Sequence, residues 1–228
     1  MKKNLALNGF LGSRSDWNLW KDLSPCEISV APDLWTWAKN FNAWVKKNIK
    51  PPRTLVGYSM GGRLALHALL DEPWLWTRGL LISTNPGLKD EEARLQRIQA
   101  DAIWAERFRK EPWKKLMTEW ENQPIFQTAT FRPKRREQDY CREALAQYLE
   151  NFSLGKQDNL LPKLKMLKVP LIWVTGGNDL IYESLAKEAL NEHSTHLSLS
   201  GGSHRVHFEF PEIIRQWLLA HKSFDRRF

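Results

Sequence analysis

Cysteine is scarce in this sequence, and long apolar runs are missing. The 228 residues include two cysteines, Cys26 and Cys141, which form no disulfide framework and have no metal-ligand spacing. No apolar run approaches the roughly 18–20 residues that span a bilayer. The N-terminal apolar stretch stops at Asn8, which makes it too short for the core of a secretory signal. We therefore predict a cytoplasmic protein without membrane insertion.

Signatures of cofactor binding are also missing. The sequence has no metal-ligand cluster, no phosphate-binding glycine loop and no dinucleotide fingerprint, so we expect neither a metal nor a cofactor. The formal net charge is +8, but the basic residues are scattered and no nucleic-acid-binding motif accompanies them. Solvated surface charge and an acidic small substrate are the two interpretations of this charge. We expect no nucleic-acid partner, and nothing in the sequence indicates an oligomeric state.

Short apolar stretches alternate with stretches of helical periodicity along much of the chain. A hydrophobic fraction of 42% suffices for one compact domain with a sizeable core. The pattern predicts strands at residues 5–8, 26–31, 54–57, 79–83, 169–174 and 195–199, and helices at 35–49, 61–70, 183–191 and 205–220. Such alternation is typical of an α/β fold with a mostly parallel sheet, here of about six strands, flanked by helices.

The alternation breaks between residues 85 and 167. This segment has no strand-like run and contains a charged amphipathic stretch at 90–110, a tryptophan-rich stretch and a helical stretch at 137–152. We interpret it as an all-helical insertion and call residues 85–167 the cap. Residues 1–84 and 168–228 then form the core.

The strongest motif is Gly57-Tyr58-Ser59-Met60-Gly61, which has the form G-x-S-x-G. It lies between a predicted strand and a predicted helix, which is the setting of the nucleophile elbow in α/β-hydrolases. Glycines suit such a crowded, strained turn, and the helix N-terminus after Ser59 favours negative charge. A chance match in a tight turn is the alternative. The flanking elements favour an α/β-hydrolase fold with Ser59 as a catalytic residue.

A serine hydroxyl needs an imidazole to take its proton, and in this fold the chain order is serine, acid, histidine. His204 follows the last predicted strand and Asp179 follows the strand before it. Among the other candidates, His207 is the second choice for the base and Asp158 for the acid. We predict Ser59, Asp179 and His204 as the catalytic triad, in which the acid fixes the imidazole tautomer.

An oxyanion hole needs two backbone N–H donors. One usually comes from the residue after the nucleophile, here Met60, and the other from the loop after the first strand, here Gly9-Phe10-Leu11-Gly12. We predict Phe10 and Met60 as the donors. An ordinary glycine-rich turn is the alternative interpretation of this loop.

Further residues resemble those of one enzyme family. The segment Leu55–Arg63 has Tyr58 before the serine and Arg63 after the glycines, and neither is required by the general hydrolase pattern. Other matching segments lie at residues 85–105, 119–126, 154–164 and 202–211. From Gly9 to about Pro211 the chain resembles the 2-succinyl-6-hydroxy-2,4-cyclohexadiene-1-carboxylate synthase family of menaquinone biosynthesis. Members of that family are lyases with an α/β-hydrolase fold.

The resemblance implies a 2,5-elimination that expels pyruvate from a small polycarboxylate substrate. Ser59, polarised by His204, then acts as a base on a ring C–H, and no acyl-enzyme forms. The substrate-binding residues implied by the resemblance are Tyr58, Arg63, Arg97, Trp120 and Arg136. Among these, the planar fork of Arg63 suits bidentate contact with a carboxylate.

The chain also departs from the family pattern. Asn8 stands where the family has a histidine, and the family's arginines just before the residue matching Trp104 are absent. Arg136 lies one position out of register with a cap arginine of the family. Because these departures concern substrate recognition, a carboxylic-ester or C–C bond hydrolase with the same triad is the alternative function. A non-catalytic binding protein is a further alternative, and the complete triad argues against it.

Overall fold

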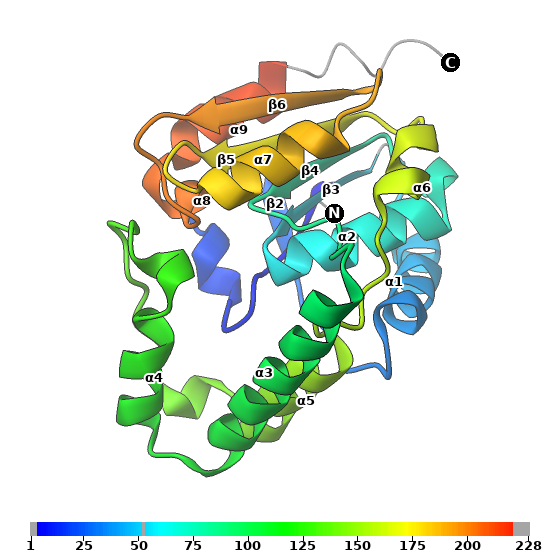
Figure 1. The fold of residues 1–228 in the computed structure, drawn as a ribbon. Coiled ribbons are helices and arrows are strands. Elements are labelled where there is room, and N and C mark those ends of the chain that lie inside the picture. The colour runs from blue at the N-terminus through cyan, green and yellow to red at the C-terminus, as the bar shows by residue number, and fades with distance from the viewer. Residues whose placement is uncertain (1–3, 52, 221–228) are drawn as a thin grey trace.

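The strands of the described chain join in one parallel sheet (Figure 1). The computed structural model describes residues 4–51 and 53–220. The strand order is β2-β1-β3-β4-β5-β6, and each neighbouring pair is parallel. The strands are β1 (Asn4–Leu7), β2 (Leu23–Cys26), β3 (Thr54–Tyr58), β4 (Arg78–Ile82), β5 (Leu171–Gly176) and β6 (Ser194–Leu199). The prediction of an α/β fold with a parallel sheet is confirmed.

Helices cover both faces of this sheet. The helices of the described residues are α1 (Leu34–Asn48), α2 (Met60–Asp71), α3 (Glu91–Lys110), α4 (Trp113–Glu121), α5 (Arg142–Asn151), α6 (Leu161–Met166), α7 (Leu180–Ala189), α8 (Val206–Glu209) and α9 (Pro211–Ala220). One face packs against α1, α2, α6 and α7 through strand residues such as Leu55 and Trp173. The opposite face packs against α8 and α9 through Val56 and Val174. Successive strand residues point to opposite faces, so burial on both faces explains the continuous apolar runs.

Two predicted elements differ from the observed ones. The second strand is Leu23–Cys26 instead of 26–31. It is an edge strand, a position that tolerates Pro25, and the apolar residues that suggested the later range, Ile28 and Val30, lie in the loop after it. The helix predicted at 205–220 is divided into α8 and α9, because Pro211 cannot continue a helix and begins a new one.

Between β4 and β5 the described chain forms helices and turns without a strand. Helices α3, α4 and α5 lie together on one side of the sheet (Figure 1) and share an apolar cluster that includes Ala105, Phe108, Leu116 and Leu149. The division into core and cap stays a prediction, and its ends at 1–3 and 221–228 lie outside the described residues. Within 4–51 and 53–220, no helix is both long and apolar enough to cross a membrane.

The turn between β3 and α2 has no room for side chains on its glycines. A Cβ atom on Gly61 would lie 2.3 Å from the carbonyl oxygen of Asn8 and 2.4 Å from that of Leu7. A Cβ atom on Gly57 would lie 2.5 Å from the carbonyl oxygen of Gly61. The start of α2 therefore packs directly on the backbone at the end of β1.

The first prediction concerns this contact. Gly61→Ala should lower the free energy of unfolding by about 1–3 kcal/mol, because the added methyl group overpacks a site whose neighbours are backbone atoms. Gly177→Ala is the matched control, since its Cβ would meet its nearest neighbour at 3.3 Å. Urea unfolding followed by tryptophan fluorescence measures both variants. Equal stability of the two would contradict the packing described for the turn.

His67 is a buried histidine in the middle of α2. Its Nδ1–H donates to the carbonyl oxygen of Arg63 at 2.7 Å, and its ring meets that of Trp35 edge-on at a centroid distance of 4.6 Å. Burial lowers the pKa of His67 from 6.5 to about 4. The imidazole is therefore neutral in the native protein at neutral pH and serves packing.

The second prediction follows from that pKa. Between pH 6.5 and pH 4 the unfolded chain binds a proton at His67 while the native protein does not, so stability falls as the pH falls. We expect His67 to account for a loss of the order of 3 kcal/mol over this window. His67→Asn keeps an N–H donor for Arg63 but does not titrate, so its stability should fall less steeply. Identical pH slopes for the two proteins in urea unfolding would contradict the assignment.

Candidate active site

Ser59 occupies the turn between β3 and α2 in a strained conformation. Its φ is +51°, in the left-handed region that residues with side chains rarely adopt. The residue directly precedes α2 and stands at the carboxyl end of β3. This conformation turns the hydroxyl into a cavity above the sheet edge.

Two loops at the same sheet edge bring His204 and Asp179 close to Ser59. His204 follows β6, and its Nε2 lies 3.1 Å from Ser59 Oγ. Asp179 follows β5, and its Oδ2 lies 2.8 Å from His204 Nδ1. The imidazole of His204 is 1% exposed. Its Nδ1–H donates a hydrogen bond to the Asp179 carboxylate, which leaves Nε2 free to accept the serine proton. The structure brings together the three residues predicted as the triad.

The second choices for base and acid lie outside this arrangement. His207 packs behind Tyr58, with ring centroids 3.9 Å apart, and neither of its nitrogens has a hydrogen-bond partner among the described residues. Burial lowers the pKa of His207 well below its ordinary value, so it packs as a neutral ring. Asp158 accepts a hydrogen bond from Trp35 Nε1 at 3.1 Å and does not line the cavity of Ser59.

The predicted oxyanion donors flank Ser59. Met60 is the first residue of α2, where backbone N–H groups have no acceptor within the helix. Phe10 lies in the turn after β1, which is closed by a 2.9 Å hydrogen bond from the Gly12 N–H to the Gly9 carbonyl. Both residues line the cavity. Their role as donors stays a prediction.

The cavity above Ser59 has a volume of about 610 Å³ and lies between the sheet edge and the cap. Its walls are rich in aromatic side chains, which include Phe10, Tyr58, Trp104, Trp120, Phe126 and Tyr182. The rings of Tyr182 and Phe126 lie 4.5 and 6.1 Å from the imidazole of His204. Apolar walls of this kind, with few polar groups, are typical of small-molecule sites.

Two arginines bring positive charge to the cavity. Arg63, on α2, is 8% exposed, and its Nη1 donates to Gln157 Oε1 at 3.3 Å. Arg97, on α3, pairs with Asp101 at 2.8 Å. Burial, and then the charge of Arg97, lower the pKa of Arg63 to about 10, so it remains protonated at neutral pH. A buried guanidinium whose described partner is an uncharged amide suits an anionic ligand.

Four of the five residues implied for substrate binding line this cavity, namely Tyr58, Arg63, Arg97 and Trp120. Arg136 is not brought there. Its guanidinium pairs with Asp139 at 2.9 Å, and 70% of its side chain is exposed. Arg136 precedes a short 3₁₀ turn at Glu137–Asp139, and this local pairing directs the side chain to the surface.

Two residues of the site were not predicted from the sequence. Tyr182, on α7, lines the cavity beside His204, and no motif marks it. Gln157 is fully buried against Arg63. The only signal for it is its place at the end of the family-like segment Leu154–Gln157.

Comparisons with known proteins identify the family of this chain. The family described as serine aminopeptidase, S33, matches residues 33–210. A 2-succinyl-6-hydroxy-2,4-cyclohexadiene-1-carboxylate synthase of Serratia proteamaculans is 33% identical over 204 residues, which cover 80% of this chain and 79% of the relative. The enzyme of the same name from Yersinia pseudotuberculosis is 33% identical, with 95% of this chain and 86% of the relative covered.

Solved structures share the fold. MenH from S. aureus superposes with a TM-score of 0.90 at 22% identity, over 99% of this chain and 96% of that chain. A thermophilic esterase from Thermogutta terrifontis superposes with a TM-score of 0.70 at 18% identity, over 95% and 88% of the two chains. The predicted α/β-hydrolase fold and the family resemblance are both confirmed. This chain belongs to the α/β-hydrolase family described as serine aminopeptidase, S33, and within it to the 2-succinyl-6-hydroxy-2,4-cyclohexadiene-1-carboxylate synthases.

Proposed function

We propose that this protein is a lyase that eliminates pyruvate from 2-succinyl-5-enolpyruvyl-6-hydroxy-3-cyclohexene-1-carboxylate. The product is 2-succinyl-6-hydroxy-2,4-cyclohexadiene-1-carboxylate, the compound named in its relatives. We further propose that it works in the cytoplasm, because Cys26 and Cys141 are both free thiols, as is usual in a reducing compartment.

The observation that carries the proposal is the buried charge of Arg63 beside the Ser59–His204 pair. A neutral ester has no group to pair with that guanidinium. A substrate carboxylate supplies a charge-assisted, bidentate partner. Arg97 lines the same cavity but is already paired with Asp101, so Arg63 is the arginine placed to bind a substrate carboxylate.

The proposed chemistry begins with removal of a ring proton. Ser59 Oγ takes the proton from the ring C–H as its own proton passes to His204 Nε2, and the Asp179 carboxylate stabilises the imidazolium. The electron pair left on the ring delocalises into the succinyl carbonyl, whose oxygen accepts hydrogen bonds from the N–H groups of Phe10 and Met60. Return of the electrons forms a ring double bond at the deprotonated carbon and shifts the existing ring double bond by one position. This shift breaks the C–O bond, and the enolpyruvyl group leaves as the enolate of pyruvate. The proton on His204 returns to the departing enolate.

The same triad fits a carboxylic-ester or C–C bond hydrolase, in which Ser59 attacks a carbonyl carbon. The Thermogutta esterase shares the fold of this chain, so the fold is compatible with ester hydrolysis. Turnover of a neutral nitrophenyl ester faster than release of pyruvate would favour it.

The third prediction tests the role of Ser59 as the base. Ser59→Ala should lower the rate of pyruvate release by at least about 10³-fold, because the group that removes the ring proton is lost. The substrate is generated in a coupled reaction, and both pyruvate and the diene chromophore are followed. Unchanged circular dichroism controls for folding. Release by the variant at a rate near that of the unsubstituted enzyme would refute the role of Ser59.

The fourth prediction tests the role of the Arg63 charge in substrate binding. Arg63→Met keeps an unbranched apolar stem and removes the guanidinium, so KM should rise by about 10- to 100-fold, the usual worth of a charged hydrogen bond. Arg136→Met is the matched control, because it removes the same charge from an exposed residue outside the cavity. Equal KM values for the two variants would remove the proposed role of Arg63.

A further inference from the structure

The segment from Glu121 to Phe131, which we call the cap wall, forms one side of the cavity. It begins at the last residue of α4 and then has a single short 3₁₀ turn, Pro124–Phe126. Five of its residues line the cavity: Gln123, Pro124, Ile125, Phe126 and Thr128. With so little regular structure inside it, the segment depends for its position on contacts with the rest of the protein.

Arg205, the residue after His204, makes contacts along the whole cap wall. Its two terminal nitrogens pair with the Glu121 carboxylate at 2.6 and 2.7 Å, and Nη1 also donates to the carbonyl oxygen of Phe131 at 3.2 Å. The guanidinium lies 4.1 Å from the ring centroid of Phe126. The Arg205 side chain is 5% exposed. One buried cation therefore touches the start, the middle and the end of the segment.

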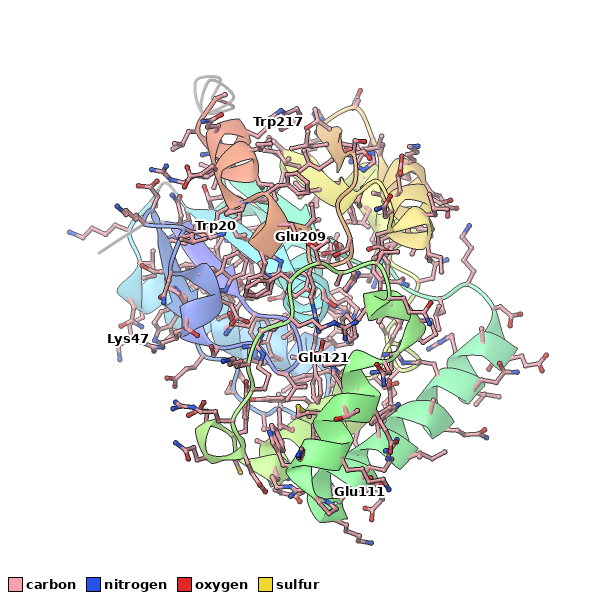
Figure 2. All side chains as sticks on the ribbon, turned by 90° about the vertical axis from the view of Figure 1, so that its left-hand side faces the viewer. Trp20, Lys47, Glu111, Glu121, Glu209 and Trp217 are labelled. Atoms are coloured by element: carbon pink, nitrogen blue, oxygen red, sulfur yellow. The ribbon has the colours of Figure 1, made fainter. Side chains whose placement is uncertain are left out.

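We call the contacts of Arg205 with the cap wall the first tie. Glu209 makes a second tie through Ser203, on the other side of His204. Its carboxylate accepts hydrogen bonds from the backbone N–H and the hydroxyl of Ser203, at 2.8 and 2.9 Å. It also accepts from the backbone N–H and the hydroxyl of Thr130, both at 2.9 Å. The residues before and after His204 are thus both joined to the cap wall. Glu121 and Glu209, the acidic partners in the two ties, are labelled in Figure 2.

Neither Arg205 nor Glu209 lines the cavity, so neither is placed to touch substrate. Arg205 packs against the ring of Phe126, and that ring meets the imidazole of His204 edge-on at a centroid distance of 6.1 Å. Release of the cap wall would free that ring and open one side of the cavity. Substrate would then have to order the segment on binding, which weakens apparent affinity.

We propose that Arg205 and Glu209 are positioning residues that fasten the cap wall to the loop of His204, so that the catalytic base and the substrate-facing wall are held as one unit. The kinetic part of this proposal rests on the proposed lyase function. The structural part, the two ties, can be measured without any activity.

The test compares Glu121→Gln, Arg205→Met and the double variant with Arg136→Met, which removes an exposed cap arginine outside both ties. The rate of hydrogen–deuterium exchange in peptides covering residues 121–131 measures how firmly the two ties hold the segment. Initial rates of pyruvate release give KM and kcat. We expect faster exchange in this segment and a KM raised about 10-fold, with kcat changed by less than about threefold, in each single variant. The double variant should differ little from Arg205→Met, because the contact that Glu121→Gln weakens is already lost when Arg205 is replaced. Arg136→Met should match the unsubstituted protein.

Thr130→Val is a milder second variant. It removes one hydroxyl donor to Glu209 from an exposed residue, and it should raise exchange in the same peptides. Unchanged exchange in Thr130→Val and the Arg205–Glu121 variants would overturn the ties. Faster exchange with unchanged KM would overturn the positioning role, as would single effects that multiply in the double variant. If the unsubstituted protein releases no pyruvate, the lyase function fails, while exchange still decides whether the ties hold the segment.

Discussion

The hydrogen bond between His204 and Ser59 joins residues 145 positions apart, and the parallel sheet is what makes it possible. Because β3, β5 and β6 end at the same edge, the loops that follow them deliver serine, acid and histidine to one point. The backbone of Gly61 packs directly on the backbone at the end of β1, and this contact holds the serine turn in place. Groups held on rigid elements need little rearrangement when charge develops during a reaction.

Charge distinguishes this cavity from a site for neutral esters. Arg63 is buried with Gln157 as its hydrogen-bond partner, and burying a charge is unfavourable unless it is paired. In the proposed function a substrate carboxylate supplies the missing pairing, so the free enzyme would gain from binding an anion. A lining of low polarity strengthens such an attraction, and the cap supplies aromatic side chains to the cavity walls. The ties at Arg205 and Glu209 then connect the cap wall to the histidine that carries the proton.

The features predicted correctly from the sequence depend on short patterns and on chain order. The Gly57–Gly61 elbow needs only a strand before it and a helix after it, and the positions of Asp179 and His204 follow from counting strand ends. The features that were missed depend on contacts between distant segments. Arg136 is turned to solvent by Asp139, Tyr182 reaches the cavity because α7 packs beside it, and β2 ends where the ladder to β1 ends. Periodicity within one segment carries no information about such contacts.

In the proposed reaction Ser59 acts as a base and not as a nucleophile. The most direct test is a single-turnover measurement of pyruvate release with substrate that carries deuterium at the ring carbon to be deprotonated. We expect the deuterated substrate to react more slowly than the ordinary one, because the C–H bond breaks in the step that Ser59 catalyses. Equal rates, together with a substrate fragment attached to Ser59 in the quenched enzyme, would contradict it and establish covalent catalysis.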